Sequence, residues 1–258
     1  MSIPNLSVIL TTHLRPKLLA RSLESLLNQT DDNFQIILCS DEGSIETRDI
    51  ANEYLRKNDC LLVLPHLVGP SSTRNEGLRI ASGKKVIFLD DDDTFDIDFF
   101  ENLNKSTCNT NHILHYFNYS KCQEVSIDGV KAIETVKHYQ GNNKTEIMVG
   151  NFIPNNSFVV DSCIAKSVMF DVSLRSHEDW EYLISLNKMI KFAHIDIYGP
   201  NIYSSDNTSR NNDSYRNGSV MLDFLSIYRK HPSDDPRIKL ARSQALASFG
   251  VQIPAELL

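Results

Sequence analysis

The sequence lacks the features that mark secreted, membrane-spanning and zinc-binding proteins. It has five cysteines in 258 residues, an odd number with no Cys-x-x-Cys pair, so neither a disulfide framework nor a zinc site is expected. No apolar run approaches the roughly 20 residues of a membrane span, and the N-terminus has no signal-peptide pattern. We therefore expect a protein of the reduced cytoplasm.

Positive charge is also in the minority. The chain has 26 Lys and Arg against 33 Asp and Glu, a formal net charge of -7. Because it has no basic stripe either, nucleic acid is not an expected partner. Hydrophobic residues make 41% of the chain, an ordinary share for a globular protein. The length allows one large α/β domain or two modest ones.

Strand and helix patterns alternate along roughly the first 100 residues. Short apolar runs at residues 6–11, 34–39, 61–64 and 85–89 predict strands, and apolar residues at helical spacing lie between them. This alternation predicts a mostly parallel sheet with crossover helices on its faces.

Three single residues in this part carry local predictions. Gly77 lies inside a predicted helix at residues 72–81 and costs about 1 kcal/mol of helix stability, which indicates that something approaches the helix closely there. Gly83 is expected to end that helix as a left-handed C-cap. Asp98 is expected to cap a short helix that runs through Leu103.

After about residue 104 the pattern is less regular. The stretch at residues 201–218 is rich in Asn, Ser and Asp and is expected to be a mobile loop, and residues 129–150 fit no pattern. The remaining predicted elements are strands at 112–119 and 158–161 and helices at 179–186, 220–228 and 238–249.

The most informative stretch is an acidic run that directly follows a buried strand. Apolar residues 86–89 precede Asp90, Asp91, Asp92 and Asp93. Four adjacent carboxylates repel one another, so we expect a positive charge beside them. Mg²⁺ and Mn²⁺ take carboxylate oxygens together with substrate phosphates, and ligands bind at the carboxyl ends of parallel strands. The alternative is a solvated turn that caps the next helix. Which of the four would touch a metal stays open.

Two further residues are candidates for binding a nucleotide. Asp41 ends the second predicted strand on the same edge of the sheet, where it is suited to accept a hydrogen bond from a base or a ribose. A simple turn former is the alternative. Arg74 lies near the start of a helix, where anions are favoured, and its guanidinium suits a diphosphate. An exposed helical arginine is the alternative.

A second acidic pair, Glu178 and Asp179, begins the predicted helix at 179–186. The helix dipole stabilises carboxylates at that position, which is a sufficient structural reason for the pair. The functional interpretation is a general base for a hydroxyl nucleophile, with Trp180 as an apolar wall. His177 is a candidate ligand or proton shuttle, although a lone histidine is more often neither.

The order of these motifs resembles the family-2 glycosyltransferases of the GT-A fold, of the bacterial surface-polysaccharide type. The likeness covers about residues 4–210. The acidic run resembles the family's Leu-Asp-x-Asp-Asp motif. At residues 11–13 this chain has Thr-Thr-His, where the family often has Pro and Tyr-Asn. The segments that carry the likeness are residues 7–29, 69–83, 88–93 and 170–180.

This resemblance implies an α/β GT-A fold: a Rossmann-like, mostly parallel sheet with flanking helices, a smaller acceptor-side region and C-terminal helices. It implies transfer of a sugar from a nucleotide-diphosphate sugar, expected to be UDP-linked, to a hydroxyl of a glycan or lipid-linked glycan, with inversion. The implied cofactor is Mn²⁺ or Mg²⁺. Residues 1–105 would bind the nucleotide sugar, 106–212 would bind the acceptor and carry the catalytic base, and 213–258 would form a helical tail.

The resemblance also assigns roles to residues. Asp92 would be the main metal ligand, Asp90 would hold ribose or the metal, and Asp179 would be the general base. Arg210, in the polar stretch, is expected to close over the diphosphate. The other residues expected to contact substrate are Thr11, Asp41, Arg74, Glu178 and Trp180.

Two alternatives remain open at this point. Residues 88–94 also fit the Asp-x-Asp-x-Thr opening of haloacid-dehalogenase-like phosphatases, with Asp90 as the nucleophile, although three strand-helix units precede it here. A nucleotide-sugar-binding module without catalysis is the other alternative. By analogy to the family, the protein is expected to work beside the inner face of the cell membrane, as a peripheral protein. The sequence does not indicate an oligomeric state.

Overall fold

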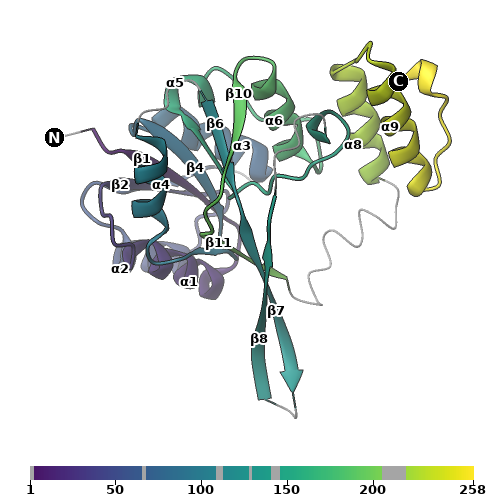
Figure 1. Ribbon diagram of the computed structural model, residues 1–258. Helices are drawn as coiled ribbons and strands as arrows, with labels where there is room; N and C mark the ends of the chain where they lie inside the picture. The colour runs from purple at the N-terminus through teal and green to yellow at the C-terminus, as the bar shows by residue number, and fades with distance from the viewer. Residues whose placement is uncertain (1–2, 66–67, 109–112, 128–129, 141–145, 205–218) are drawn as a thin grey trace.

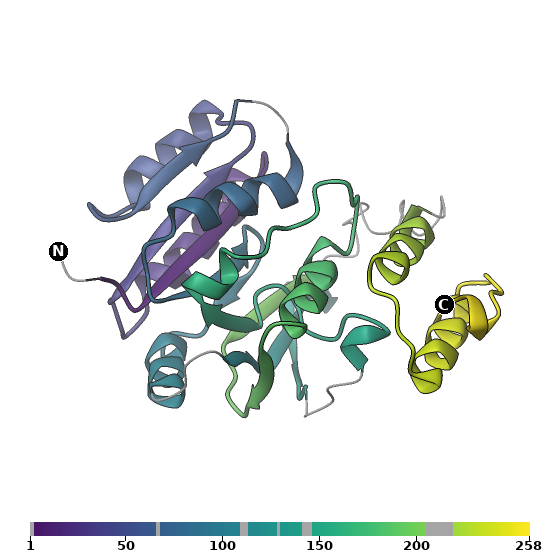
Figure 2. The same ribbon diagram turned by 90° about the horizontal axis from the view of Figure 1, so that it is seen from above.

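The computed structural model describes residues 3–65, 68–108, 113–127, 130–140, 146–204 and 219–258. The chain forms a seven-stranded sheet with helices on both faces, a smaller four-stranded sheet and a pair of C-terminal helices (Figure 1). Seen from above, that helical pair stands at one end of the body (Figure 2).

The seven-stranded sheet carries the predicted parallel core. Neighbouring strands pair in parallel except at β9, which lies antiparallel between β4 and β6. The predicted strands therefore correspond closely to observed ones, and the predicted α/β fold class is confirmed. In sheet order the strands are β10 (Lys191–Ile195), β6 (Ile113–Phe117), β9 (Phe158–Asp161), β4 (Lys85–Asp90), β1 (Leu6–Thr12), β2 (Phe34–Ser40) and β3 (Cys60–Val63).

Alternate residues of the central strands enter two separate hydrophobic cores. In β1, Val8 and Leu10 pack with α1 (Pro16–Leu27), α2 (Ile45–Tyr54) and α4 (Phe99–Thr107) on one face. Ile9 packs on the other face, the side of α3 (Gly69–Ile80), α5 (Ser162–Ala165) and α6 (Glu178–Asn187). Burial on both faces explains why these strands are continuously apolar in sequence.

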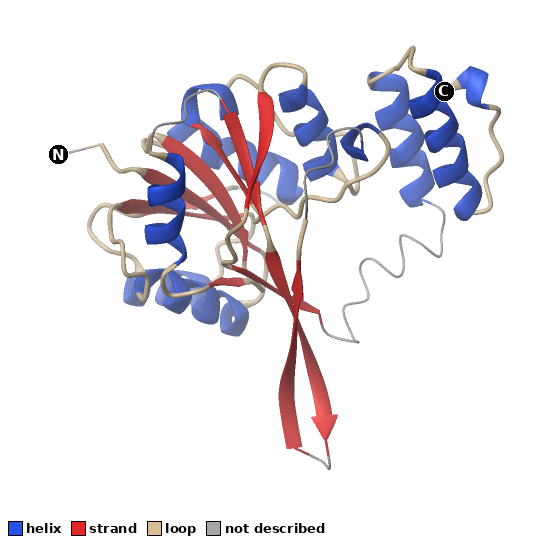
Figure 3. Cartoon of the chain, viewed as in Figure 1, coloured by secondary structure: helices blue, strands red, loops and turns tan. Residues whose placement is uncertain are grey.

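The smaller sheet combines segments that are distant in sequence. Its order is β5 (Thr94–Phe95), β11 (Pro200–Ser204), β7 (Tyr119–Ile127) and β8 (Val130–His138). The β7–β8 hairpin projects from the body (Figure 3). Because β11 is a strand, the prediction of a loop from residue 201 is wrong for 201–204. The rest of that stretch, with Arg210, lies outside the described residues. The segment that fitted no pattern contains β8 and a short helix, η1 (Glu146–Met148).

The glycine predictions have different outcomes. A Cβ atom on Gly77 would lie 2.6 Å from Cγ2 of Ile9, so the predicted close approach is confirmed, and the approaching group is the sheet. Gly83 is not left-handed, because α3 ends at Ile80 and Ala81 is the C-cap. A Cβ on Gly83 would lie 2.6 Å from the backbone nitrogen of Ser7, so this glycine is explained by contact with β1.

Asp98 does precede α4, but its side chain makes no capping hydrogen bond. The predicted helix is therefore present, whereas the predicted cap is wrong. A carboxylate at this position does not need to bond the helix, because it is exposed to water.

The C-terminal helices share a hydrophobic core with the main sheet. α8 (Ser219–Lys230) packs on α6, and Trp180 lies 4.8 Å from Phe224 and 5.7 Å from Tyr228 between ring centroids. α9 (Pro236–Ser248) and a short helix, η2 (Ala255–Leu257), complete the chain. Among the described segments, none of the helices has the length and apolar character required to cross a bilayer. The functional division at residues 105 and 212 stays a prediction.

Candidate active site

A cavity of about 780 Å³ lies at the carboxyl ends of β1, β2 and β4. Parallel strands end at this edge, where α/β proteins bind ligands. The N-terminal half of α3, the first residue of α6 and the end of β11 complete its wall. The lining residues that matter for the chemistry are Thr11, His13, Arg15, Asp41, Arg74, Asp90, Asp91, Asp92, Glu178 and Tyr203.

The acidic run divides into two exposed and two buried carboxylates. The side chains of Asp90 and Asp92 are 35% and 28% exposed in the cavity. Asp91 and Asp93 are buried. The backbone turns within the run, with the amide of Asp93 donating to the carbonyl of Asp90, so successive side chains leave in different directions.

The two buried carboxylates are bonded inside the protein. Asp91 Oδ2 accepts hydrogen bonds from Thr12 Oγ1 at 2.8 Å and from the backbone nitrogen of His13 at 3.2 Å. Asp93 accepts from Asn156 Nδ2 and from the backbone nitrogen of Tyr203, each at 2.9 Å. Asp93 therefore anchors the smaller sheet against the strand end.

Burial raises the pKa of both carboxyls. The pKa of Asp91 rises to about 6, because burial outweighs its hydrogen bond from Thr12 and the charge of Arg15. Burial raises the pKa of Asp93 well above its ordinary value, and the charges of Asp90 and Asp92 raise it further. Both side chains thus belong to the framework of the site.

Arginines supply the positive charge that the acidic run requires. Arg15 Nη1 lies 2.5 Å from Asp92 Oδ2 and 3.2 Å from Asp91 Oδ1. Arg74 Nη2 lies 2.8 Å from Asp90 Oδ1, and Arg21 donates to the backbone carbonyl of Asp92 at 2.5 Å. The predicted positive charge beside the run is therefore confirmed, and it comes from arginines of the chain itself.

Arg74 connects the strand end to the second acidic pair. Its Nη1 donates to Glu178 Oε1 at 2.7 Å, and its side chain is 6% exposed. Burial acts to lower the pKa of Arg74, but Asp90 and Glu178 raise it above its ordinary value. The alternative of an exposed helical arginine is wrong, because Arg74 is buried, lines the cavity and bridges two carboxylates. Its role beside a diphosphate stays a prediction.

Asp41 and Thr11 lie where the sequence predicts, at the ends of their strands. Asp41 Oδ1 lies 2.7 Å from His13 Nδ1, with the aspartate side chain 9% exposed and the imidazole 29% exposed. Thr11 Oγ1 donates to Asp90 Oδ1 at 3.2 Å. Both residues line the cavity, so their atoms are available to a ligand.

The second acidic pair occupies the start of α6. Glu178 lines the cavity, whereas Asp179 is not among its lining residues. Asp179 Oδ2 accepts from Asn151 Nδ2 at 2.9 Å, and Oδ1 accepts from the backbone nitrogen of Trp180 at 2.8 Å. Burial raises the pKa of Asp179 to about 7, the charge of Glu178 adds to this rise, and Arg74 opposes it.

Two candidates from the sequence lie away from the cavity. Trp180 is fully buried and donates its indole hydrogen to the carbonyl of Ile147 at 2.7 Å, so the predicted substrate wall is wrong. Its ring is part of the core because the first turn of α6 is covered by α8. His177 Nδ1 lies 2.9 Å from Ser176 Oγ, and burial lowers the pKa of His177. His177 is not among the cavity-lining residues.

The structure adds residues that the sequence interpretation did not select. Arg15 and His13 follow the end of β1, and their place after a strand was the available signal. Asn151, Asn156 and Tyr203 had no such signal, because they reach the acidic residues from 28, 63 and 110 positions away. Contacts over such separations arise only when the tertiary structure forms.

The donor set at the cavity fits a divalent cation. Asp90 and Asp92 expose carboxylate oxygens into the same space. Mg²⁺ and Mn²⁺ sites in nucleotide enzymes combine one or two carboxylates with substrate phosphates. Within the described ranges, no three His, Cys, Asp or Glu side chains form a complete metal cage. The available ligands therefore suit an ion that arrives together with a diphosphate.

Comparison with known proteins identifies the family. The model of glycosyl transferase family 2 matches residues 7–169. The chain belongs to glycosyl transferase family 2. This membership confirms the resemblance seen in the sequence motifs. The phosphatase alternative is therefore wrong.

Curated relatives are similar over part of their length. An uncharacterized glycosyltransferase of Rickettsia bellii is 27% identical over 221 residues, which are 84% of this chain and 31% of that protein. A GalNAc(5)-diNAcBac-PP-undecaprenol beta-1,3-glucosyltransferase of Campylobacter jejuni is 37% identical over 93 residues, 35% of this chain and 30% of that protein. The chain thus spans less than a third of the length of either relative.

Solved structures share the fold. TarS residues 1–349 of S. aureus in complex with UDP-GlcNAc match with a TM-score of 0.64 and 16% identity, over 96% of this chain and 73% of that one. The mannosyltransferase PcManGT of Pyrobaculum calidifontis, in complex with GDP-Man and Mn²⁺, matches with a TM-score of 0.63 and 12% identity, over 99% and 78%. The predicted GT-A fold is confirmed.

Proposed function

We propose that this family-2 protein transfers a sugar from a UDP-linked donor to a hydroxyl of a glycan or lipid-linked glycan, with inversion at the anomeric carbon. The observation that carries the proposal is the cavity itself. It brings Asp41, Arg74, Asp90, Asp92 and Glu178 together from two strand ends and two helices. Such a set offers acceptors for a base and a ribose beside ligands for a diphosphate and its counter-ion.

The donor end of the cavity follows from its charges. Asp90 and Asp92 are the residues that would hold Mn²⁺ or Mg²⁺, and a bound divalent cation offsets charge that develops on a leaving diphosphate. Asp41 accepts a hydrogen bond from the base, and Thr11 lines the nucleotide pocket. Arg74 adds a fixed positive charge beside the donor, which needs no reorganisation because the guanidinium is already held by two carboxylates.

Asp179 is the general base of the proposed reaction. Its carboxylate removes the proton of the acceptor hydroxyl while the hydroxyl oxygen attacks the anomeric carbon from the face opposite the diphosphate. A base with a pKa near the working pH is efficient because it combines the correct protonation state with sufficient basicity. The raised pKa of Asp179, about 7, meets that condition.

The names of related proteins support the choice of substrates. One solved neighbour holds UDP-GlcNAc, and a curated relative is named for an undecaprenol-linked acceptor. We infer a lipid-linked acceptor and a peripheral position at the inner face of the membrane for this protein. In this proposal residues 1–105 bind the donor, 106–212 shape the acceptor site and 213–258 form the helical tail.

A donor panel tests the proposal. Purified protein is mixed with each nucleotide sugar, with and without Mn²⁺, and freed nucleoside diphosphate is measured with glycan acceptors present. Release of UDP that requires both acceptor and Mn²⁺ is the expected result. Tight donor binding with no release under any condition would instead favour a binding module without catalysis.

A further inference from the structure

The backbone just before the acidic pair is held by the C-terminal helix α8. Oδ2 of Asp223 accepts two hydrogen bonds from Ser176, one from its backbone nitrogen at 2.8 Å and one from its hydroxyl at 2.7 Å. Asp223 is 7% exposed, so water competes little for these bonds. A single oxygen of α8 therefore fixes the residue that lies two positions before Glu178.

The residue between them has a strained backbone. His177 adopts a left-handed conformation, with φ 60° and ψ 22°, which is unfavourable for a residue with a side chain. Only Leu14 shares a positive φ among the other non-glycine residues that the structure describes. His177 is the N-cap of α6, so this turn sets the direction in which the helix leaves.

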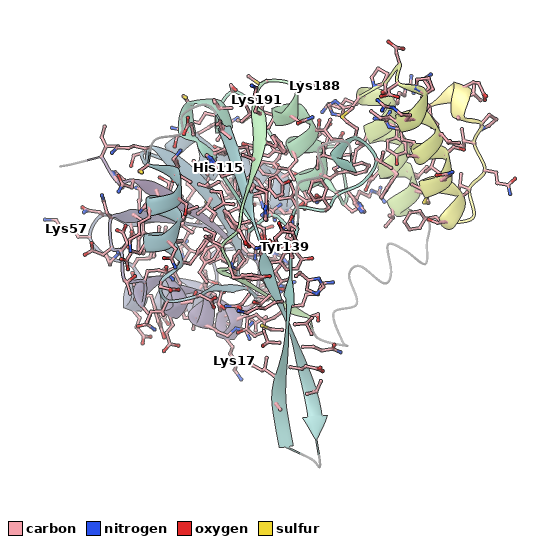
Figure 4. All side chains as sticks on the ribbon, in the orientation of Figure 1. Lys17, Lys57, His115, Tyr139, Lys188 and Lys191 are labelled. Carbon is pink, nitrogen blue, oxygen red and sulfur yellow. The ribbon has the colours of Figure 1, made fainter. Side chains whose placement is uncertain are left out.

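Contacts with α8 hold the strained turn from both sides. The His177 ring packs edge-on against Phe224, with centroids 4.8 Å apart, and its Nδ1 lies 2.9 Å from the Ser176 hydroxyl. Further along, Lys188 Nζ at the end of α6, labelled in Figure 4, lies 2.6 Å from His231 Nδ1 just after α8. The two helices are thus joined at both ends of α6, including the end that carries Asp179.

We propose that Asp223 is a positioning residue for the acidic pair. By accepting both hydrogen bonds from Ser176, it stabilises the left-handed turn at His177 and thereby aims Glu178 and Asp179 at the cavity edge. The catalytic consequence rests on the proposed function, whereas the effect on backbone order does not. The helical tail then contributes to the active site without touching the substrate.

Two variants and a control separate this role from general stability. Asp223→Ala removes the acceptor, and Asp223→Asn keeps one oxygen that receives both bonds. Asp235→Ala is the matched control. Asp235 is also an aspartate of the C-terminal helical region, and its side chain caps α9 by accepting from the backbone nitrogen of Arg237 at 2.9 Å. Asp235 is far along the chain from the turn at His177, and its described hydrogen bonds go to nearby residues such as Ser233 and Arg237.

Kinetics and hydrogen exchange are both measured on the full chain. We expect Asp223→Ala to lower kcat by about 10- to 100-fold, the scale of a misaligned catalytic group. The KM for donor should change less than about twofold, because the donor-binding residues are untouched. Asp223→Asn should restore most of kcat, and Asp235→Ala should leave it unchanged. Amides of residues 176–181 should exchange faster in Asp223→Ala only.

The outcomes that would overturn the proposal are distinct from failure of the proposed function. If the wild type transfers sugar and Asp223→Ala is equally active, Asp223 is not a positioning residue. The same follows if Asp235→Ala loses as much kcat as Asp223→Ala, or if Asp223→Asn is as poor as Asp223→Ala. If the wild type transfers no sugar, unchanged exchange at residues 176–181 in Asp223→Ala still refutes the proposal. If Asp223→Ala does not fold, Ser176→Ala replaces it, with faster exchange and lower kcat again required.

Discussion

At the residue scale, the acidic run shows how four identical side chains acquire two functions. A turn between Asp90 and Asp93 leaves the carboxylates of Asp90 and Asp92 partly exposed and those of Asp91 and Asp93 buried. Asp91 and Asp93 anchor β1 and the smaller sheet, which leaves Asp90 and Asp92 as the pair that a ligand reaches. The sequence indicated a binding site here but not this division, since it depends on partners up to 110 positions away.

Removing one exposed carboxylate tests the metal assignment. We expect Asp92→Ala to lose the Mn²⁺-dependent part of UDP binding, because the cation retains only Asp90 from the protein. Calorimetric titration of UDP with Mn²⁺ and with chelator measures this. Asp98→Ala, an exposed carboxylate with no capping bond, is the control and should bind as the wild type does. Tight, chelator-insensitive UDP binding by Asp92→Ala would contradict the assignment.

The pKa of Asp179 predicts the pH dependence of transfer. A general base acts when it is deprotonated, and the pKa of this carboxyl is raised to about 7. The acceptor kcat/KM should therefore rise about tenfold per pH unit below pH 7 and level off above it. In Asp179→Asn, we expect at least about 100-fold slower turnover with unchanged donor affinity. Full activity in that variant would remove Asp179 from the mechanism.

Leu14 is the second strained residue and lies between two residues that line the site. Its φ is 52° and its side chain is exposed, while His13 and Arg15 on either side face the cavity. Asparagine tolerates the left-handed region better than leucine. Leu14→Asn should therefore raise the free energy of unfolding by about 1 kcal/mol, measured by urea titration. Ile45→Asn, at another exposed site, should leave the free energy of unfolding unchanged. An equal increase in both variants would show that relief of backbone strain is not the cause.

At the element scale, α3 shows why a residue with low helix propensity occupies the interior of a helix. Gly77 is unfavourable in a helix, yet it allows α3 to approach β1 and β2. This close packing places Arg74, one turn earlier, beside the strand ends. Tertiary packing thus outweighs the local preference of the chain.

A substitution at Gly77 tests that balance. Alanine would gain about 1 kcal/mol of helix propensity but place its Cβ 2.6 Å from Ile9 Cγ2 and 3.0 Å from Cys39 Sγ. Overpacking a core costs about 1–3 kcal/mol, so we expect Gly77→Ala to lower the melting temperature. Arg79→Ala, on the exposed side of the same helix, is the control and should change it little. A stabilised Gly77→Ala would show that the sheet yields easily.

The elements that could be predicted were those with a continuous local pattern. The strands of the parallel core are buried on both faces and read as apolar runs, so β1, β2 and β4 were found from sequence. β8 lacks that signal because most of its described side chains are exposed, and β11 lacks it because this short strand pairs with β5 and β7, which are far away in the chain. Trp180 fitted an apolar helix face, and the helix at residues 220–228 was also predicted, but the sequence did not show that this helix, α8, packs on that face.

At the scale of the whole molecule, the C-terminal helices are part of one cooperative structure. Val220, Phe224, Ile227 and Tyr228 lie in the same hydrophobic cluster as Phe88 of the main sheet. A buried hydrogen bond adds to this, with His231 Nε2 2.8 Å from Glu181 Oε1. Separating the tail would expose these apolar side chains to water.

This shared core predicts a single unfolding transition. Trp180 is the only tryptophan of the chain and lies at the contact between α6 and α8, so its fluorescence reports on the tail. Far-UV circular dichroism reports on both sheets and all helices. The two signals should change together with temperature or urea, as two-state unfolding requires. A fluorescence change that clearly precedes the loss of ellipticity would show that the tail detaches first.

The sequence by itself determined the parallel α/β core, the acidic strand end and the family, because each is written in a contiguous stretch. Only the tertiary structure decided which aspartates are buried, that Arg15 and Arg74 form ion pairs with the acidic run, and that Trp180 and Asp223 connect the C-terminal helices to the start of α6. The physical reason is that burial and ion pairing depend on what packs from elsewhere in the chain. Local spacing specifies where a side chain lies along its own element, and assembly specifies what it meets.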